Sequence, residues 1–132
     1  MSKKDSSNRV AIALITDDKD NVLMGCRNDN GRYTFPAGHL KINECPFEGG
    51  IRETKEETGL DVKTIKMVTV SKSDGLILYL FKVTIDPNQE VDTSKDPDME
   101  CDTWIYQDPN DVKENLHVPL EKNIALKYWA NN

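Results

Sequence analysis

The sequence predicts a domain that mixes α-helix and β-strand, of the α/β or α+β class. Short apolar runs rich in β-branched residues recur along the chain, beginning with the buried-type segment Arg9–Thr16. One stretch, Pro46–Thr58, carries helix start and stop signals instead. With 132 residues and 37% hydrophobic content, the chain is long enough for one core and too short for two, so we expect residues 1–132 to form a single domain.

Turn residues divide the first part of the chain into three segments, of which the first two are expected to be strands. Asp17–Asn21 separates Arg9–Thr16 from a second strand at Val22–Arg27, and we expect these two strands to pair as a hairpin. A second turn, Asn28–Arg32, leads into an extended segment at Tyr33–Pro36. A loop is then expected to connect this segment to the helix.

The helix is predicted at Pro46–Thr58. Proline suits the first turn, where its missing N–H costs nothing, and Gly59 suits the left-handed position that follows the last turn. A narrow and partly polar stripe is expected to dock on a sheet because its members recur at steps of four, three and four residues. The stripe consists of Phe47, Ile51, Thr54 and Thr58.

Strands are expected again after the helix. A turn at Ser73–Gly75 separates Ile65–Ser71 from Leu76–Thr84, and the polar segment Asp86–Asp98 is typical of a loop at the rim of a fold. The last predicted elements are a strand at Cys101–Tyr106 and a C-terminal helix at Pro119–Ala130 that offers Leu120, Ile124, Leu126 and Trp129 to the core.

Three glutamates of the predicted helix form an acidic patch. Glu53, Glu56 and Glu57 are three and four residues apart, so their side chains project from one surface. Like charges at this spacing repel by roughly 0.2–0.5 kcal/mol per pair, and the helix dipole disfavours anions in this half of the helix. A divalent cation would reverse both penalties. The alternative is a solvated face on which Arg52 and its neighbours make surface ion pairs.

A longer pattern favours the metal site. Gly38 is followed after five residues by Glu44, after seven more by Arg52-Glu53, and then by Glu56-Glu57 and Gly59-Leu60. This arrangement resembles the Nudix box, and the chain resembles a small MutT-type Nudix hydrolase.

The resemblance extends beyond the box. Tyr33–His39 is similar to the aromatic, proline and small-residue run that precedes it, and Met99–Trp104 is similar to a later stretch with glutamate and tryptophan. The family usually has an aliphatic residue at Thr54 and often alanines at Gly49 and Gly50. We expect these departures to affect local stability and not the metal ligands. The resemblance implies the Nudix fold, a mixed β-sheet sandwiched between α-helices.

The resemblance also implies a metal site for Mg²⁺ or Mn²⁺. Glu56 and Glu57 would be the primary ligands, and Glu53 would either bind a further ion or polarise the attacking water. The backbone carbonyl of Ala37 and the carboxylate of Glu100 are further candidate ligands.

Other residues are candidates for positioning and for substrate binding. Arg52 would orient Glu53, unless it makes an ordinary surface ion pair, and Glu44 would either hydrogen-bond within the box loop or reach the outer shell of the metal. Arg27 is a candidate for a substrate phosphate. The candidates for stacking on a nucleobase, each of which is alternatively a core aromatic, are Tyr33, Phe35 and Trp104.

Composition and net charge limit the classes of binding partner that we expect for this protein. The net charge of −6 and the pI near 4.9 argue against duplex nucleic acid, and no apolar run has the length of a membrane span. Three scattered cysteines, Cys26, Cys45 and Cys101, favour reduced thiols in a cytoplasmic protein. A monomer and a homodimer are both compatible with the sequence.

The sequence therefore favours a metal-dependent pyrophosphohydrolase acting on a small-molecule nucleotide. A nucleoside triphosphate cleaved to a nucleoside monophosphate and pyrophosphate is the leading substrate, followed by ADP-ribose and dinucleoside polyphosphates. A non-catalytic nucleotide-binding module is the alternative class. Loss of a box carboxylate would favour that alternative, and here every one of them is present.

Overall fold

The computed structural model describes residues 6–94 and 101–108. In these ranges it contains one helix and seven strands. They are β1 (Ser6–Ile15), β2 (Val22–Arg27), β3 (Tyr33–Thr34), β4 (Ala37–Lys41), α1 (Pro46–Thr58), β5 (Val62–Ser73), β6 (Leu76–Ile85) and β7 (Cys101–Gln107).

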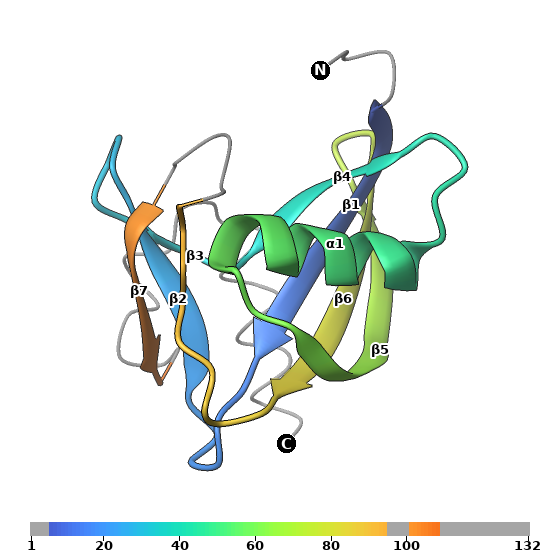
Figure 1. Ribbon diagram of the computed structural model, residues 1–132. Coiled ribbons are helices and arrows are strands. Elements are labelled where there is room, and N and C mark those ends of the chain that lie inside the picture. The colour runs from blue at the N-terminus through green and yellow to red at the C-terminus, as the bar shows by residue number, and fades with distance from the viewer. Residues whose placement is uncertain (1–5, 95–100, 109–132) are drawn as a thin grey trace.

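The strands form two sheets, and α1 lies across one face of the larger one (Figure 1). The four-stranded sheet has the order β4-β1-β6-β5, in which β1 and β6 are parallel and the other neighbours antiparallel. The three-stranded sheet has the order β3-β2-β7. The C-terminal end of α1 points toward this smaller sheet. The α/β class and the mixed sheet are confirmed, whereas the expected helix at Pro119–Ala130 lies outside the described residues.

Strand β1 is the centre of the core. Its even-numbered residues Ile12 and Leu14 belong to one apolar cluster, and Ala11, Ala13 and Ile15 belong to a second cluster on the side of α1. Because β4 and β6 occupy both of its edges, β1 is enclosed on every side, which explains its nearly continuous run of apolar residues.

The prediction of a hairpin between the first two strands was wrong. The turn forms as expected, since the Asp17 carboxylate accepts hydrogen bonds from the backbone N–H groups of Lys19 and Asn21, both at 2.9 Å. Only one bridge, between Thr16 and Val22, continues it. Strand β1 has no free edge to offer β2, so β2 pairs with β3 and β7 instead.

The segment before the helix also differs from the prediction. Strand β3 ends at Thr34, and a further strand, β4, occupies the place where a loop was expected. Pro36 has no N–H for a sheet ladder, and its carbonyl accepts a hydrogen bond from the Ala13 N–H at 2.9 Å. The chain therefore changes sheets at the proline, which brings the box glycine onto an edge strand.

Helix α1 has the predicted bounds, but only part of the expected stripe is buried, and two glycines outside the stripe are buried with it. Phe47 and Ile51 of the expected stripe are 39% and 41% exposed, whereas Gly49 and Gly50 are buried. A Cβ at Gly49 would lie 2.1 Å from Leu40 Cδ2, and a Cβ at Gly50 would lie 3.1 Å from Ile65 Cδ1. The two glycines thus let the helix approach the sheet closely.

Thr54 and Thr58 complete this buried face, and only one of their hydroxyls is satisfied. Both residues are 0% exposed. The Thr58 hydroxyl donates to the Thr54 carbonyl at 2.6 Å and accepts from the Leu60 N–H at 3.3 Å. The Thr54 hydroxyl has no hydrogen-bond partner within the described part of the chain. A buried hydroxyl without a partner carries a desolvation cost.

We predict that the same substitution has opposite effects at these two positions. Thr54→Val keeps the shape and removes an unpaired hydroxyl, so it should raise the free energy of unfolding by about 1–2 kcal/mol. Thr58→Val removes two hydrogen bonds and should lower the free energy of unfolding by about 1–2 kcal/mol. Urea unfolding of both variants measures the difference, and a loss of stability in Thr54→Val would contradict the prediction.

Candidate active site

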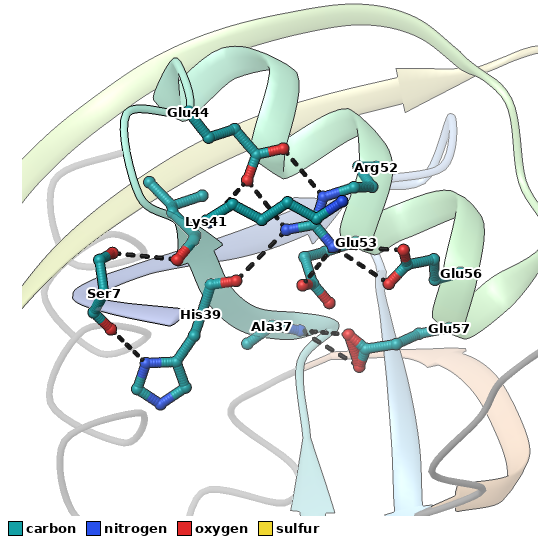
Figure 2. A network of polar contacts seen from close by, with 10 residues as sticks. Ser7, Ala37, His39, Lys41, Glu44, Arg52, Glu53, Glu56 and Glu57 are labelled. Atoms are coloured by element: carbon teal, nitrogen blue, oxygen red, sulfur yellow. Dashed lines mark hydrogen bonds and ion pairs between the residues drawn. The ribbon is translucent and has the colours of Figure 1, made fainter. Parts of the chain in front are cut away.

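The guanidinium of Arg52 lies at the centre of a carboxylate cluster where α1 lies against β4 (Figure 2). Its Nε and Nη2 donate to the two oxygens of Glu44, both at 2.9 Å. Its Nη1 donates to Glu53 Oε1 at 2.9 Å and to Glu56 Oε2 at 3.1 Å. Arg52 is therefore shared among three carboxylates, one of which is Glu53.

Glu44 connects this cluster to the loop between β4 and α1. Its Oε1 also accepts a hydrogen bond from the Lys41 N–H at 2.9 Å, while Arg52 Nη2 donates to the His39 carbonyl at 3.3 Å. Of the two roles considered for Glu44, the structure has the hydrogen bond within the loop. The Lys41 and His39 partners are backbone groups, which sequence reasoning did not find because any residue could supply them.

The same contacts shift the pKa values of the cluster. The hydrogen bond from Arg52 lowers the pKa of Glu44 from 4.5 to about 2, against the opposing effect of burial. The bidentate bond to Glu44 in turn raises the pKa of Arg52. Burial raises the pKa of Glu53, and the Arg52 charge only partly offsets it. Of these two carboxylates, Glu53 therefore has the greater affinity for a proton.

Glu56 and Glu57 lie further along the helix. The side chain of Glu56 is 41% exposed, so it is the most accessible of the carboxylates that contact Arg52. Glu57 faces β4, where its Oε2 accepts a hydrogen bond from the Ala37 N–H at 3.1 Å (Figure 2). The structure thus brings Glu57 and Ala37 together, through the amide N–H of Ala37.

The cluster suits a hard cation in charge and in donor type. Glu44, Glu53 and Glu56 contribute −3 and Arg52 contributes +1, which leaves −2 when all are ionised. Carboxylate oxygens are the ligands that Mg²⁺ prefers. Within residues 6–94 and 101–108, however, no three acidic, histidine or cysteine side chains already converge on one point. Arg52 Nη1 lies between the carboxylates of Glu53 and Glu56 and donates to both.

The residues predicted to bind substrate are not gathered in one place. Tyr33 pairs with Cys26 and Trp104 pairs with Gly25, so these two aromatic side chains lie on opposite faces of the three-stranded sheet. Trp104 is on the side of α1, packed against the same apolar cluster as Leu60. The structure does not unite Tyr33 and Trp104 in a single pocket.

The other predicted substrate and metal residues have different surroundings. Phe35 is 1% exposed and belongs to the core. Arg27 forms a bidentate pair with Asp29, at 3.0 and 2.8 Å. Glu100 lies outside the described residues. The imidazole of His39 is directed away from the carboxylates, with its Nδ1 at 2.9 Å from the Ser7 carbonyl oxygen (Figure 2).

Comparison with known proteins places these features in a family. The model of the NUDIX domain matches residues 6–127, which is most of the chain. The chain belongs to the Nudix family. It is therefore a hydrolase of the Nudix type, in a family whose members act on small-molecule nucleotides and generally use divalent metal ions.

Individual relatives of this Nudix hydrolase are distant. A MutT-like protein of Streptomyces ambofaciens is 28% identical over 110 residues, covering 81% of this chain and 68% of the relative. The phosphatase NudJ of Escherichia coli K12 is 28% identical over 117 residues, covering 84% of this chain and 76% of the relative.

Solved structures support the fold. The crystal structure of the MutT protein from Bacillus halodurans has a TM-score of 0.70 and 24% identity, and the match covers 89% of this chain and 78% of that one. At this identity the likeness establishes the Nudix fold alone. Within the described residues, no helix is both long enough and apolar enough to span a membrane.

The lowered pKa of Glu44 predicts a pH-dependent contribution to stability. A carboxylate whose pKa is depressed on folding stabilises the protein fully above its ordinary pKa of 4.5, and the contribution is lost as the pH falls toward about 2. Glu44→Gln should lower the free energy of unfolding by about 1.5–3 kcal/mol at pH 7, because a charged hydrogen-bond acceptor is lost.

This difference between wild type and Glu44→Gln should narrow as the pH is lowered through 4.5. Urea unfolding over a series of pH values measures it. A difference that stays constant with pH would show that the charge of Glu44 does not stabilise the loop.

Proposed function

We propose that this Nudix hydrolase cleaves the diphosphate linkage of a nucleoside diphosphate derivative. A nucleoside triphosphate is the leading substrate, with a nucleoside monophosphate and pyrophosphate as products. The observation that carries the proposal is the arrangement of the box carboxylates, three of which pair with Arg52 while Glu57 contacts the Ala37 N–H. A module that only bound nucleotides would have no need of this acidic cluster, which repels phosphate unless cations are present.

The names of relatives support cleavage of a phosphorus-oxygen bond. They do not distinguish between the candidate substrates. One relative is named MutT-like and another is named a phosphatase, each at 28% identity. ADP-ribose and dinucleoside polyphosphates are the alternative substrates. We also propose a cytoplasmic enzyme, which is supported by the absence of a disulfide between the described cysteines Cys26, Cys45 and Cys101.

We assign the metal ligands to Glu56 and Glu57, with Ala37 and Glu100 as further candidates. A bound Mg²⁺ or Mn²⁺ would neutralise charge on the phosphates and lower the pKa of a coordinated water. The accessibility of Glu56 and the net negative charge of the cluster support this assignment.

Glu53 is the residue we propose to position or deprotonate the attacking water. Its side chain is 15% exposed and its pKa is raised by burial, which increases its affinity for a proton. Arg52 holds its Oε1, and Glu44 holds Arg52 from the opposite side. The carboxylate is thus oriented before substrate arrives, which lowers the cost of reorganisation during the reaction.

For the nucleoside we propose Trp104, because it lies on the side of the sheet that faces α1. Tyr33 lies on the other face and Phe35 is enclosed in the core, which leaves Trp104 as the best-placed of the three predicted aromatics. Arg27 remains a candidate phosphate contact, for which it would exchange its pairing with Asp29.

We predict that Glu57→Gln lowers the catalytic constant by roughly 100-fold or more, because a hard cation loses a charged ligand. The fold should persist, and calorimetry should detect weaker binding of Mn²⁺. Glu48→Gln is the matched control, since Glu48 is an exposed glutamate in the first turn of the same helix. Unchanged activity of Glu57→Gln at saturating metal would refute the assignment.

Glu53→Gln should reduce the catalytic constant far more than it raises the Michaelis constant. An interaction made mainly in the transition state has this signature. Steady-state kinetics with the best substrate of a nucleotide panel measures both constants. A variant that changes the Michaelis constant alone would argue against a role of Glu53 in activating water.

The bond that breaks is tested by product analysis in isotopically labelled water. A nucleoside triphosphate should yield a nucleoside monophosphate and pyrophosphate, whereas ADP-ribose should yield AMP and ribose 5-phosphate. The nucleoside keeps its α-phosphate in both cases. Orthophosphate as the first product from a triphosphate would mean hydrolysis of the terminal phosphate, and the proposed function would then be rejected.

A further inference from the structure

Gly38 lies directly beneath the carboxylate of Glu53. A Cβ built at Gly38 would lie 2.2 Å from Glu53 Oε2, 2.3 Å from Cδ and 2.6 Å from Oε1. All three distances are well below any van der Waals contact, so the whole carboxylate occupies the space that a side chain at this position would fill.

The need for glycine here is not one of backbone freedom. The glycines with positive φ are Gly31, Gly59 and Gly75, and Gly38 is not among them. It is an ordinary residue of the edge strand β4, where it pairs with Ala11 of β1. An alanine would fit this backbone, and what it would displace is the Glu53 side chain.

Glu53 is held on its other side by polar contacts that return to the same strand. Its Oε1 accepts from Arg52 Nη1 at 2.9 Å, and Arg52 is paired with Glu44. Glu44 in turn accepts from the Lys41 N–H at 2.9 Å. The contacts therefore run from β4 through three side chains and back to β4, so Glu53 has little freedom to move away from Gly38.

We propose that Gly38 is a positioning residue for the reaction, in that the absence of its side chain creates the seat in which Arg52 holds the Glu53 carboxylate. This role rests on the proposed function, because it assumes that Glu53 acts on the attacking water. Any side chain at position 38 would push the carboxylate about 1 Å away, since the 2.2 Å distance must lengthen to an ordinary contact of 3.4 Å or more. Misplacement on this scale costs on the order of 100-fold in rate.

Four proteins test the proposal: wild type, Gly38→Ala, Glu53→Ala and the double variant. Gly38→Ala should reduce the catalytic constant by on the order of 100-fold, with little change in the Michaelis constant. Adding Gly38→Ala to Glu53→Ala should cause little further loss, since no carboxylate remains to be displaced. An equal loss in both backgrounds would overturn the proposal.

Urea unfolding of the same four proteins gives a readout that does not depend on activity. Gly38→Ala should lower the midpoint when Glu53 is present and leave it nearly unchanged when residue 53 is alanine. If Gly38→Ala does not fold, the double variant should restore folding because the clash is removed. Failure of both to fold, or an equal shift in both backgrounds, would show that Gly38 acts through the backbone.

The two proposals can fail separately. Absence of nucleotide hydrolysis by the wild-type protein with Mg²⁺ or Mn²⁺ would reject the proposed function, and the unfolding cycle would still decide whether Gly38 seats Glu53. Hydrolysis by wild type together with additive effects of Gly38→Ala and Glu53→Ala would reject the role of Gly38 alone.

Discussion

The sharing of one guanidinium among three carboxylates is the interaction on which this site depends. Arg52 pairs with Glu44 through Nε and Nη2 and with Glu53 and Glu56 through Nη1. Without it, three negative charges would lie close together on one helix and its loop, where burial already disfavours ionisation of Glu53. Arg52 reduces the repulsion between the three carboxylates. The cluster still has a net negative charge, which favours a divalent cation.

Close approach between α1 and the four-stranded sheet is the second constraint. Gly49 and Gly50 bring the helix against Leu40 and Ile65, and Gly38 makes room for Glu53. A helix lifted by larger residues would carry its carboxylates away from the edge strand. The contact between Glu57 and the Ala37 N–H exists only because helix and strand are this close. The packing of α1 against the sheet thus determines where its carboxylates lie relative to β4.

Some features of the helix lower the stability of the fold. Burial of the Glu53 carboxylate raises its pKa, so the folded state loses stability as the pH rises from the ordinary pKa of 4.5 toward the raised value. The unpaired hydroxyl of Thr54 adds a cost on the opposite, buried face, for which we have no functional account. The Glu44 pair acts in the other direction, since its lowered pKa contributes stability near neutral pH.

The sequence by itself determined the helix, from Pro46 and Gly59, and the glutamates that this helix carries, because capping and side-chain spacing within one helix are local properties. That Glu44 joins Glu53 and Glu56 around Arg52, while Glu57 contacts β4, was decided by the tertiary structure. Only the tertiary structure decided which strands pair and which face of α1 is buried. The predicted hairpin between the first two strands does not form because β1 has both edges occupied. The buried face of α1 includes Gly49 and Gly50 beside Thr54 and Thr58, and glycines have no side chain for a hydrophobic pattern to detect. The role of Gly38 was hidden for the same reason, since space for Glu53 exists only when strand and helix meet.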